Sequence, residues 1–276
     1  MFTLNCKGKL LCIKRPLIMG ILNLNEDSFY EGSRISTMDA LLSKARQMLH
    51  EGADILDIGG QSTRPGSIRI SAGEELSRIL PAIELLAKEF DNAVLSVDTY
   101  YAEVAKQAVA AGAAIVNDIS AGELDSSMIE MVAGLAVPYI CMHMKGTPET
   151  MQQQAVYEDV VKEVLDFFIK KVAKCRLAGI HDIIIDPGFG FAKTIDQNFN
   201  LLKSLGLLKM LEVPVMAGIS RKSTVYKTLD IPVEDSLNGT TVLHTIALQN
   251  GADILRVHDV KEAREAMRLF AAYSEA

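Results

Sequence analysis

The sequence predicts a (β/α)8 barrel with an N-terminal β-hairpin, and three observations lead to that class. The chain has 276 residues, and such a barrel takes about 250. Eight short, near-continuous apolar runs alternate with helical patterns, as parallel strands covered by helices do. Four segments also repeat one pattern, in which a glycine ends a helical stretch and a strand follows: EGADILDIGG, AGAAIVNDIS, AGIHDIIIDPG and NGADILRVHD, from Glu51, Ala111, Ala178 and Asn250.

The order of elements begins with residues 1–15, in which Lys7-Gly8-Lys9 separates two short β-prone runs. We expect a hairpin there that closes the N-terminal end of the barrel. No linker divides the rest, so 1–276 is predicted to be one domain with the barrel over 16–276. The eight strands are expected at Leu17–Asn23, Asp54–Gly60, Ala93–Thr99, Ala114–Ser120, Pro138–Met144, Asp182–Gly188, Val213–Ser220 and Asp253–Asp259.

Helical patterns fill the intervals, for example over 38–52 and 158–179. Two helix starts carry capping-box sequences, Ser71 with Glu74 and Ser127 with Glu130. Pro81 should split or kink the second helix. Three stretches are long for loops after strands, and barrel enzymes keep mobile lids in such loops: 24–37, 61–71 and 145–157.

Composition excludes several classes of function. The net charge of −7 and the pI near 5.3 argue against general nucleic-acid binding, which needs a basic face. The four cysteines lack metal-type spacing, so we expect reduced thiols. The sequence shows no signal peptide and no apolar run of about 18 residues. We therefore expect a soluble cytoplasmic protein without a membrane partner.

Each predicted strand ends in polar residues, and in a parallel barrel all eight ends surround one mouth. An Asn or Asp at a strand end is usually a cap or turn former. Capping does not require Lys, Arg or His, however, so the whole set predicts a polar pocket that holds both carboxylates and cations. The ends are Asn23, Asp57, Asp98, Asn117-Asp118, His143, Asp186, Ser220-Arg221-Lys222 and Arg256-Val257-His258-Asp259.

These residue types suit a phosphorylated heterocycle. Arginine binds phosphate oxygens in a forked geometry, and the cations available are Arg64, Lys222, Arg256 and His258. Planar donors and acceptors for the edge of a ring come from Asp98, Asn117 and Asp186. Asn23 is a plausible oxygen ligand for a hydrated magnesium ion. Backbone amides around Ser223, before a helical pattern, suit a carboxylate or phosphate.

Other polar residues have structural interpretations. His50, His181 and His244 are expected in helices or turns on the far side of the barrel, as surface or packing residues. Met142 and Met144 are assigned to the core. For Asp57 and Asp118 a bracing role and a direct role stay equally open, and so do loop and ligand roles for Lys145 and Lys193.

Eight motifs in order resemble those of the dihydropteroate synthases and cover nearly all of the chain after Arg15. They are MGILNLNEDSFYEG, DIGGQSTRPG, SVDTY, NDIS, MHMKGTPETMQ, DPGFGFAKT, GISRKS and RVHDV, beginning at Met19, Asp57, Ser96, Asn117, Met142, Asp186, Gly218 and Arg256. The resemblance implies condensation of a dihydropterin diphosphate with 4-aminobenzoate in folate biosynthesis, a Mg2+ ion, a homodimer and a sulfonamide target.

The resemblance also assigns residues to three subsites. The pterin would contact Asp98, Asn117, Asp186 and Lys222. The diphosphate would contact Asn23, Thr63, Arg64, Arg256 and His258, with Asn23 also a metal ligand. The 4-aminobenzoate would contact Thr63, Arg64, Phe191, Lys222 and Ser223. The catalytic roles would fall to Asp98, Lys222 and Arg64.

Two loops depart from the family pattern. Asn25-Glu26 stands where the family usually has Thr-Pro, Glu31 where it has Asp, and Gln61 where it has Glu. Because the pocket residues are all present, we expect altered loop dynamics and retained activity.

Three other functions fit part of the pattern. A methyltetrahydrofolate-binding barrel of a corrinoid methyltransferase shares the pterin-type Asp and Asn residues, but leaves Arg256 and His258 unexplained. A non-catalytic pterin-binding paralogue is conceivable because of the altered first loop. A Schiff-base aldolase would use Lys222, although that lysine follows its strand and does not lie in the barrel interior.

Overall fold

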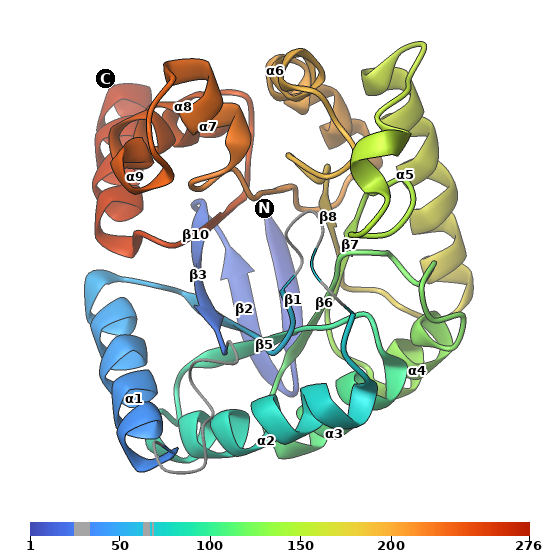
Figure 1. The fold of residues 1–276 in the computed structure, drawn as a ribbon, viewed down its shortest axis with the longest axis vertical. Helices are drawn as coiled ribbons and strands as arrows, with labels where there is room; N and C mark the ends of the chain where they lie inside the picture. The colour runs from blue at the N-terminus through green and yellow to red at the C-terminus, as the bar shows by residue number, and fades with distance from the viewer. Residues whose placement is uncertain (25–33, 63–66, 68) are drawn as a thin grey trace.

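The computed structural model describes residues 1–24, 34–62, 67 and 69–276, with the side chains of 34–37 left aside. The predicted sites Thr63 and Arg64 and the departures at Asn25, Glu26 and Glu31 lie outside these residues. Figure 1 draws the segments concerned as a grey trace.

Eight parallel strands form the barrel, and this confirms the predicted fold class (Figure 1). They are β3 (Leu17–Asn23), β4 (Ile55–Gly59), β5 (Val94–Asp98), β6 (Ile115–Asp118), β7 (Tyr139–Met142), β8 (Ile183–Asp186), β9 (Met216–Ala217) and β10 (Ile254–Val257). Their order is β8-β7-β6-β5-β4-β3-β10-β9. A parallel bridge between Ile185 and Val215 joins the two edges, so the sheet is nearly closed.

Helices surround the strands (Figure 1). They are α1 (Arg34–Glu51), α2 (Ala72–Glu89), α3 (Ala102–Ala111), α4 (Met128–Leu135), α5 (Val160–Leu177), α6 (Ile195–Lys203), α7 (Ser223–Leu229), α8 (Leu237–Gln249) and α9 (Val260–Glu275). Short 3-10 turns are η2 (Met151–Gln154), η3 (Leu205–Leu211) and η4 (Val233–Ser236). Within the described ranges, none of the helices has both the length and the apolar character needed to cross a membrane.

The repeated glycines have the expected conformation. Gly52, Gly112, Gly179 and Gly251 have φ of +102°, +131°, +94° and +92°, which side chains disfavour. Each glycine lies at the end of a helix or just after it, and a strand follows within a few residues. The repeat therefore marks αβ junctions, as predicted.

Two local predictions about helix ends and breaks are wrong. Pro81 does not split α2, which continues through it with Ile79, Ala82 and Ile83 of its inner face fully buried. Ser127 does not cap α4 with its side chain, since it already has helical dihedral angles. Ser71 does cap α2, accepting from the Glu74 amide at 3.2 Å.

One capping signal was missed. The Thr194 side chain and Gln197 form a complete capping box at the start of α6, with both reciprocal hydrogen bonds present. The Thr-x-x-Gln spacing that signals this box is visible in the sequence.

The N-terminal hairpin closes one end of the barrel, as predicted. Strands β1 (Phe2–Cys6) and β2 (Lys9–Ile13) pair antiparallel. The turn residues Lys7 and Gly8 have φ of +53° and +85°, which is typical of a tight hairpin turn. Leu4, Cys6 and Ile13 are buried in one apolar cluster with barrel-strand residues, among them Met19, Ile55, Ile115, Ile140, Ile184 and Ile254.

We predict that Leu4→Ala lowers the free energy of unfolding by about 2–5 kcal/mol, because it leaves a cavity in this cluster. Leu4 is 2% exposed, whereas Leu10 on the same hairpin is 69% exposed. Leu10→Ala is therefore the matched control, with an expected change within about 0.5 kcal/mol. Urea denaturation measures both changes. Equal stability of the two variants would show that the hairpin does not act as a plug.

Candidate functional site

Buried polar residues gather at the C-terminal ends of the barrel strands. Asp57, Asp98 and Asn117 lie on the consecutive strands β4, β5 and β6, and Asp98 pairs directly with Asn117 in the sheet register. Asp186 ends β8, and Arg256 lies on β10. The polar mouth predicted from the strand ends therefore exists.

Arg256 links two of these strands. Its Nε donates to Asp57 Oδ2 at 2.7 Å and its Nη2 donates to Asp98 Oδ2 at 2.6 Å. Asn117 Nδ2 donates to the same Asp57 oxygen at 3.0 Å. Burial opposes the charged form of Arg256, but the two carboxylates outweigh this and raise its pKa. Burial also raises the pKa of Asp98, and Arg256 opposes that rise.

Lys222 and Asp186 form a second charged group. Lys222 Nζ donates to the Phe189 carbonyl and stands 4.6 Å from the centre of the Phe191 ring. Burial lowers the Lys222 pKa to about 8, and Asp186 opposes that shift. Asp186 Oδ1 accepts from the Gly188 amide at 2.7 Å.

Gly218 leaves space between these charges. A Cβ at this position would stand 3.5 Å from Asp186 Oδ2, 3.7 Å from Lys222 Nζ and 4.0 Å from Arg256 Cβ. The first two distances are ordinary van der Waals contacts, so a methyl group fits there without a clash. Gly218 therefore lies beside a carboxylate and two cationic residues, and it has no side chain that would cover them.

His258 and Asn23 complete the described polar groups. His258 Nδ1 lies 3.0 Å from Ser220 Oγ, which also accepts the His258 amide at 3.2 Å. Burial, and next Arg256, lower the His258 pKa to about 4, so the ring is neutral at pH 7. Asn23, exposed at the end of β3, places Oδ1 beside Gly59: a Cβ added to that glycine would stand 3.4 Å from this oxygen and 3.6 Å from Asp98 Oδ2.

An apolar group borders the same end of the barrel. Phe191 is buried in a cluster with Tyr100, Ile119, Met142 and Met151. Tyr100 accepts a hydrogen bond from Gln61 Nε2, so this departure from the family pattern has a partner in the structure. Ser223 is the first residue of α7 and directly follows Lys222.

Lys193, whose role was left open, and His143, which was expected in the pocket, are braces. Lys193 is buried, and its Nζ lies 3.0 Å from His143 Nδ1 and from the Gly188 and Phe191 carbonyl oxygens. His143 packs edge-on against Phe167, with ring centres 4.9 Å apart. Burial lowers the pKa of Lys193 to about 7 and that of His143 to about 2. Polarity at a strand end did not reveal that His143 faces an aromatic cluster.

The other residues whose role was left open also have protein partners that suit a bracing role. Asp57 holds Asn117 and Arg256, and Asp118 accepts from Ser120, Gly122 and Tyr139. Lys145 forms an ion pair with Glu163 at 2.6 Å. His244 is buried, as expected of a packing residue, and burial lowers its pKa to about 4.

Glu75 is a buried carboxyl group that the sequence analysis did not single out. It lies in the first turn of α2, is 1% exposed, and accepts from Thr99 Oγ1 at 3.2 Å. Burial raises its pKa to about 8, with Asp98 adding to the rise and Thr99 and Arg78 opposing it. Glu75 is thus largely protonated at pH 7, next to the strand that carries Asp98.

Comparisons with known proteins agree on one family. The family model described as "Pterin binding enzyme" matches residues 19–258. The dihydropteroate synthase of Escherichia coli K12 is 40% identical over 265 residues, covering 95% of this chain and 93% of the relative.

Two solved structures are similar over almost their full length. One is the Xanthomonas albilineans dihydropteroate synthase with 4-aminobenzoic acid, with a TM-score of 0.92, 40% identity, and coverage of 99% of this chain and 98% of that one. The other is the Yersinia pestis dihydropteroate synthase in a sulfonamide drug complex, with a TM-score of 0.93, 40% identity and full coverage of both chains.

The raised pKa of Glu75 predicts that stability falls with rising pH. The unfolded chain releases this proton near the ordinary glutamate pKa of 4.5, and the folded chain near 8. The contribution is therefore complete below about pH 4.5 and is lost as pH rises through 8. We expect Glu75→Gln to remove this slope and to exceed the wild type in stability above pH 8. Denaturant titrations at pH 5, 7 and 9 measure it, with exposed Glu84→Gln on the same helix as control. An unchanged slope in Glu75→Gln would contradict the assignment.

Proposed function

The chain belongs to the pterin-binding enzyme family, and from that premise we infer that it catalyses the dihydropteroate synthase reaction. The reaction joins (7,8-dihydropterin-6-yl)methyl diphosphate to 4-aminobenzoate and yields 7,8-dihydropteroate and diphosphate, a step of folate biosynthesis. One observation of the site carries the argument: buried groups that suit the edge of a heterocycle lie directly beside Arg256, a permanent cation. Such a pair of subsites suits a pterin that bears a diphosphate.

We assign the pterin to the space bordered by Asp98, Asn117, Asp186 and Lys222. Gly218 supports this assignment, since it lies beside Asp186 and Lys222 and has no side chain that would cover them. Carboxylates accept hydrogen bonds from the amino and ring N–H groups of such a heterocycle, and Lys222 donates to its carbonyl oxygen. Asp98, Asn117 and Asp186 are buried, and Lys222 is held by the Phe189 carbonyl, so these side chains are oriented before the ligand arrives.

The diphosphate is assigned to Arg256, His258 and Asn23, with Thr63 and Arg64 proposed to join from residues outside the described part. Arg256 keeps its charge at any working pH, because two carboxylates raise its pKa. His258 is neutral at pH 7 and would act as a hydrogen-bond donor. Phosphate oxygens accept from both.

A magnesium ion fits this chemistry as an ion that arrives with the diphosphate. The described residues contain no group of three or more His, Cys, Asp or Glu side chains suited to hold a metal. Magnesium keeps several waters and is often bound through one or two protein oxygens together with phosphate oxygens. Asn23 would supply such an oxygen. When bound, the ion would neutralise charge on the diphosphate, and calorimetric titration with and without Mg2+ tests this proposal.

The 4-aminobenzoate is assigned to Phe191, Lys222 and Ser223, with Thr63 and Arg64 as further proposed contacts. Phe191 offers an aromatic face, and the Lys222 cation already stands over that face. Ser223 begins α7 and offers a hydroxyl group for a carboxylate.

The residues support a dissociative mechanism. The bond between the pterin methylene and the diphosphate oxygen breaks, and the electron pair leaves with the diphosphate, which Arg256 and His258 stabilise. The cation left on the methylene is delocalised into the ring, and Asp98 stabilises it. The arylamine nitrogen then attacks the methylene and releases a proton to the diphosphate or to solvent. We propose Asp98, Lys222 and Arg64 as the catalytic residues.

The family membership leaves little room for the other functions. A corrinoid methyltransferase needs no diphosphate subsite. The Lys222 that an aldolase would use lies after the end of β9 and before α7, and not on a barrel strand. A non-catalytic paralogue is decided by the assay below.

We further propose a homodimer that works in the reducing cytoplasm. Outer helices α8 and α9 expose Val242, Ile246, Leu269 and Tyr273, and apolar side chains of this kind are typical of subunit interfaces. All four cysteines are free thiols. Sedimentation velocity of the purified chain tests the dimer.

The assay combines the protein, the dihydropterin diphosphate, Mg2+ and 4-aminobenzoate, with dihydropteroate detected by mass. We expect product from the wild type. Gly218→Ala should lose most activity without loss of thermal stability, because the added methyl group meets only ordinary contacts in the protein but stands beside Asp186 and Lys222, which are proposed to bind the pterin. Gly206→Ala, whose nearest contact is 3.6 Å away in an outer segment, is the control and should stay active. Failure of the wild type to form product would refute the function.

Asp98→Asn should keep the fold and lower kcat by roughly 100-fold or more, by analogy with the loss of single electrostatic contacts worth about 3–4 kcal/mol. The change preserves shape but removes the charge that faces the developing cation. Single-turnover kinetics with saturating substrates separate this effect from binding. A near-normal rate of the chemical step would exclude Asp98 from catalysis.

A further inference from the structure

Arg221 occupies a strained turn between β9 and α7. The Lys222 amide donates to the Ile219 carbonyl at 3.1 Å, and Arg221 has a φ of +53°, which is uncommon for a residue with a side chain. Its amide donates to Thr240 Oγ1 of α8 at 3.1 Å. The turn is therefore held in place from outside the site.

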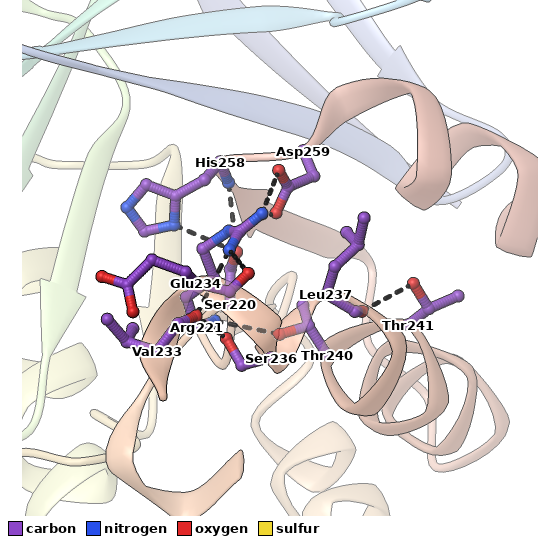
Figure 2. Close-up of polar contacts among 10 residues, drawn as sticks. All are labelled: Ser220, Arg221, Val233, Glu234, Ser236, Leu237, Thr240, Thr241, His258 and Asp259. Atoms are coloured by element: carbon purple, nitrogen blue, oxygen red, sulfur yellow. Dashed lines mark hydrogen bonds and ion pairs between the residues drawn. The ribbon is translucent and has the colours of Figure 1, made fainter. Parts of the chain in front are cut away.

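The Arg221 guanidinium binds a single carboxylate and a nearby turn, as Figure 2 shows. Nε and Nη2 donate to the two oxygens of Asp259 at 2.8 and 2.9 Å, a forked pair. Nη1 donates to the Glu234 carbonyl at 3.0 Å and to that of Val233 at 3.3 Å. Forked pairs fix orientation as well as charge.

Two neighbouring links thus join the turn after β9 to the residues that follow β10. Arg221 binds Asp259, and the preceding Ser220 binds His258, the residue before Asp259 (Figure 2). Lys222 follows on one segment, and Arg256 precedes on the other. The forked pair therefore lies behind both the diphosphate subsite and the aminobenzoate subsite.

We propose that Arg221 and Asp259 form a positioning pair that couples these two subsites, an inference that rests on the proposed function. The pair fixes the turn that presents Lys222 and Ser223 relative to the strand end that presents Arg256 and His258. Neither residue needs to touch a substrate. Loss of the Arg221–Asp259 pair lets both subsites shift together. A misplacement of about 1 Å can lower the rate up to 100-fold.

Charge alone predicts the opposite result for one partner. Asp259 is an anion next to the proposed diphosphate subsite, so its removal should strengthen anion binding if only electrostatic attraction matters. A positioning role predicts weaker binding instead. Asp259 makes no side-chain cap on α9, so its truncation does not remove a helix cap.

The experiment compares Asp259→Ala, Asp259→Asn, Arg221→Ala and the double alanine variant. Asp259→Asn keeps the side-chain shape and serves if truncation harms folding. The control is Arg264→Ala at the opposite end of the barrel. Arg264 pairs with Asp54 at 2.9 Å and also binds the Gly52 carbonyl. Exposures are 20% and 16% for this pair, against 25% and 20% for Arg221 and Asp259.

Inorganic diphosphate with Mg2+ is titrated calorimetrically, and both substrate KM values and the melting temperature are measured. We expect each Asp259 and Arg221 variant to bind diphosphate roughly 10-fold more weakly and to raise the aminobenzoate KM. The double variant should be no worse than either single one, since the pair acts as a unit. Arg264→Ala should lose stability but keep both constants.

Tighter or unchanged diphosphate binding in Asp259→Ala and Asp259→Asn would overturn the positioning role. An equal loss of binding in Arg264→Ala would also overturn it, because the losses in the Arg221 and Asp259 variants would then reflect general destabilisation. The titration does not depend on turnover. If the wild type made no dihydropteroate, the proposed function would fail, but the binding data would still test the positioning role of Arg221 and Asp259.

Discussion

The site depends on one cation, Arg256, whose side chain is 17% exposed. Arg256 is held between Asp57 and Asp98 at 2.7 and 2.6 Å, and an unpaired guanidinium at this depth would be very costly. The two ion pairs fix the ends of β4, β5 and β10 relative to one another. Asn117 adds β6 through the same Asp57 oxygen. Four strand ends of the barrel are therefore set by one hydrogen-bonded network.

The other side of the mouth is organised by a second set of braces. Lys193 donates to the carbonyl groups of Gly188 and Phe191, and His143, the residue after β7, contacts its Nζ. Arg221 and Asp259 hold the segments that carry Lys222 and His258. Charged side chains are thus used twice, once facing the pocket and once behind it. The second group supplies rigidity that the first group needs to discriminate ligands.

The sequence was sufficient for features that follow from local chemistry. The glycines at 52, 112, 179 and 251 have positive φ as the repeat requires, and the apolar runs became the eight strands. Polar strand ends correctly located the mouth, because parallel topology brings them together. The direction of a side chain was harder to predict: His143 directly follows β7 and was expected in the pocket, yet it packs on Phe167. Burial of Lys193 and continuity of α2 through Pro81 depend on tertiary packing, which spacing does not encode.

The N-terminal hairpin determines where ligands can enter and leave the enzyme. Leu4, Cys6 and Ile13 close one end of the barrel, and side chains of the barrel strands fill the interior next to them. Ligands consequently enter and leave through the same opening, at the C-terminal ends of the strands. Because the hairpin closes the other end, both substrates and both products share this one opening.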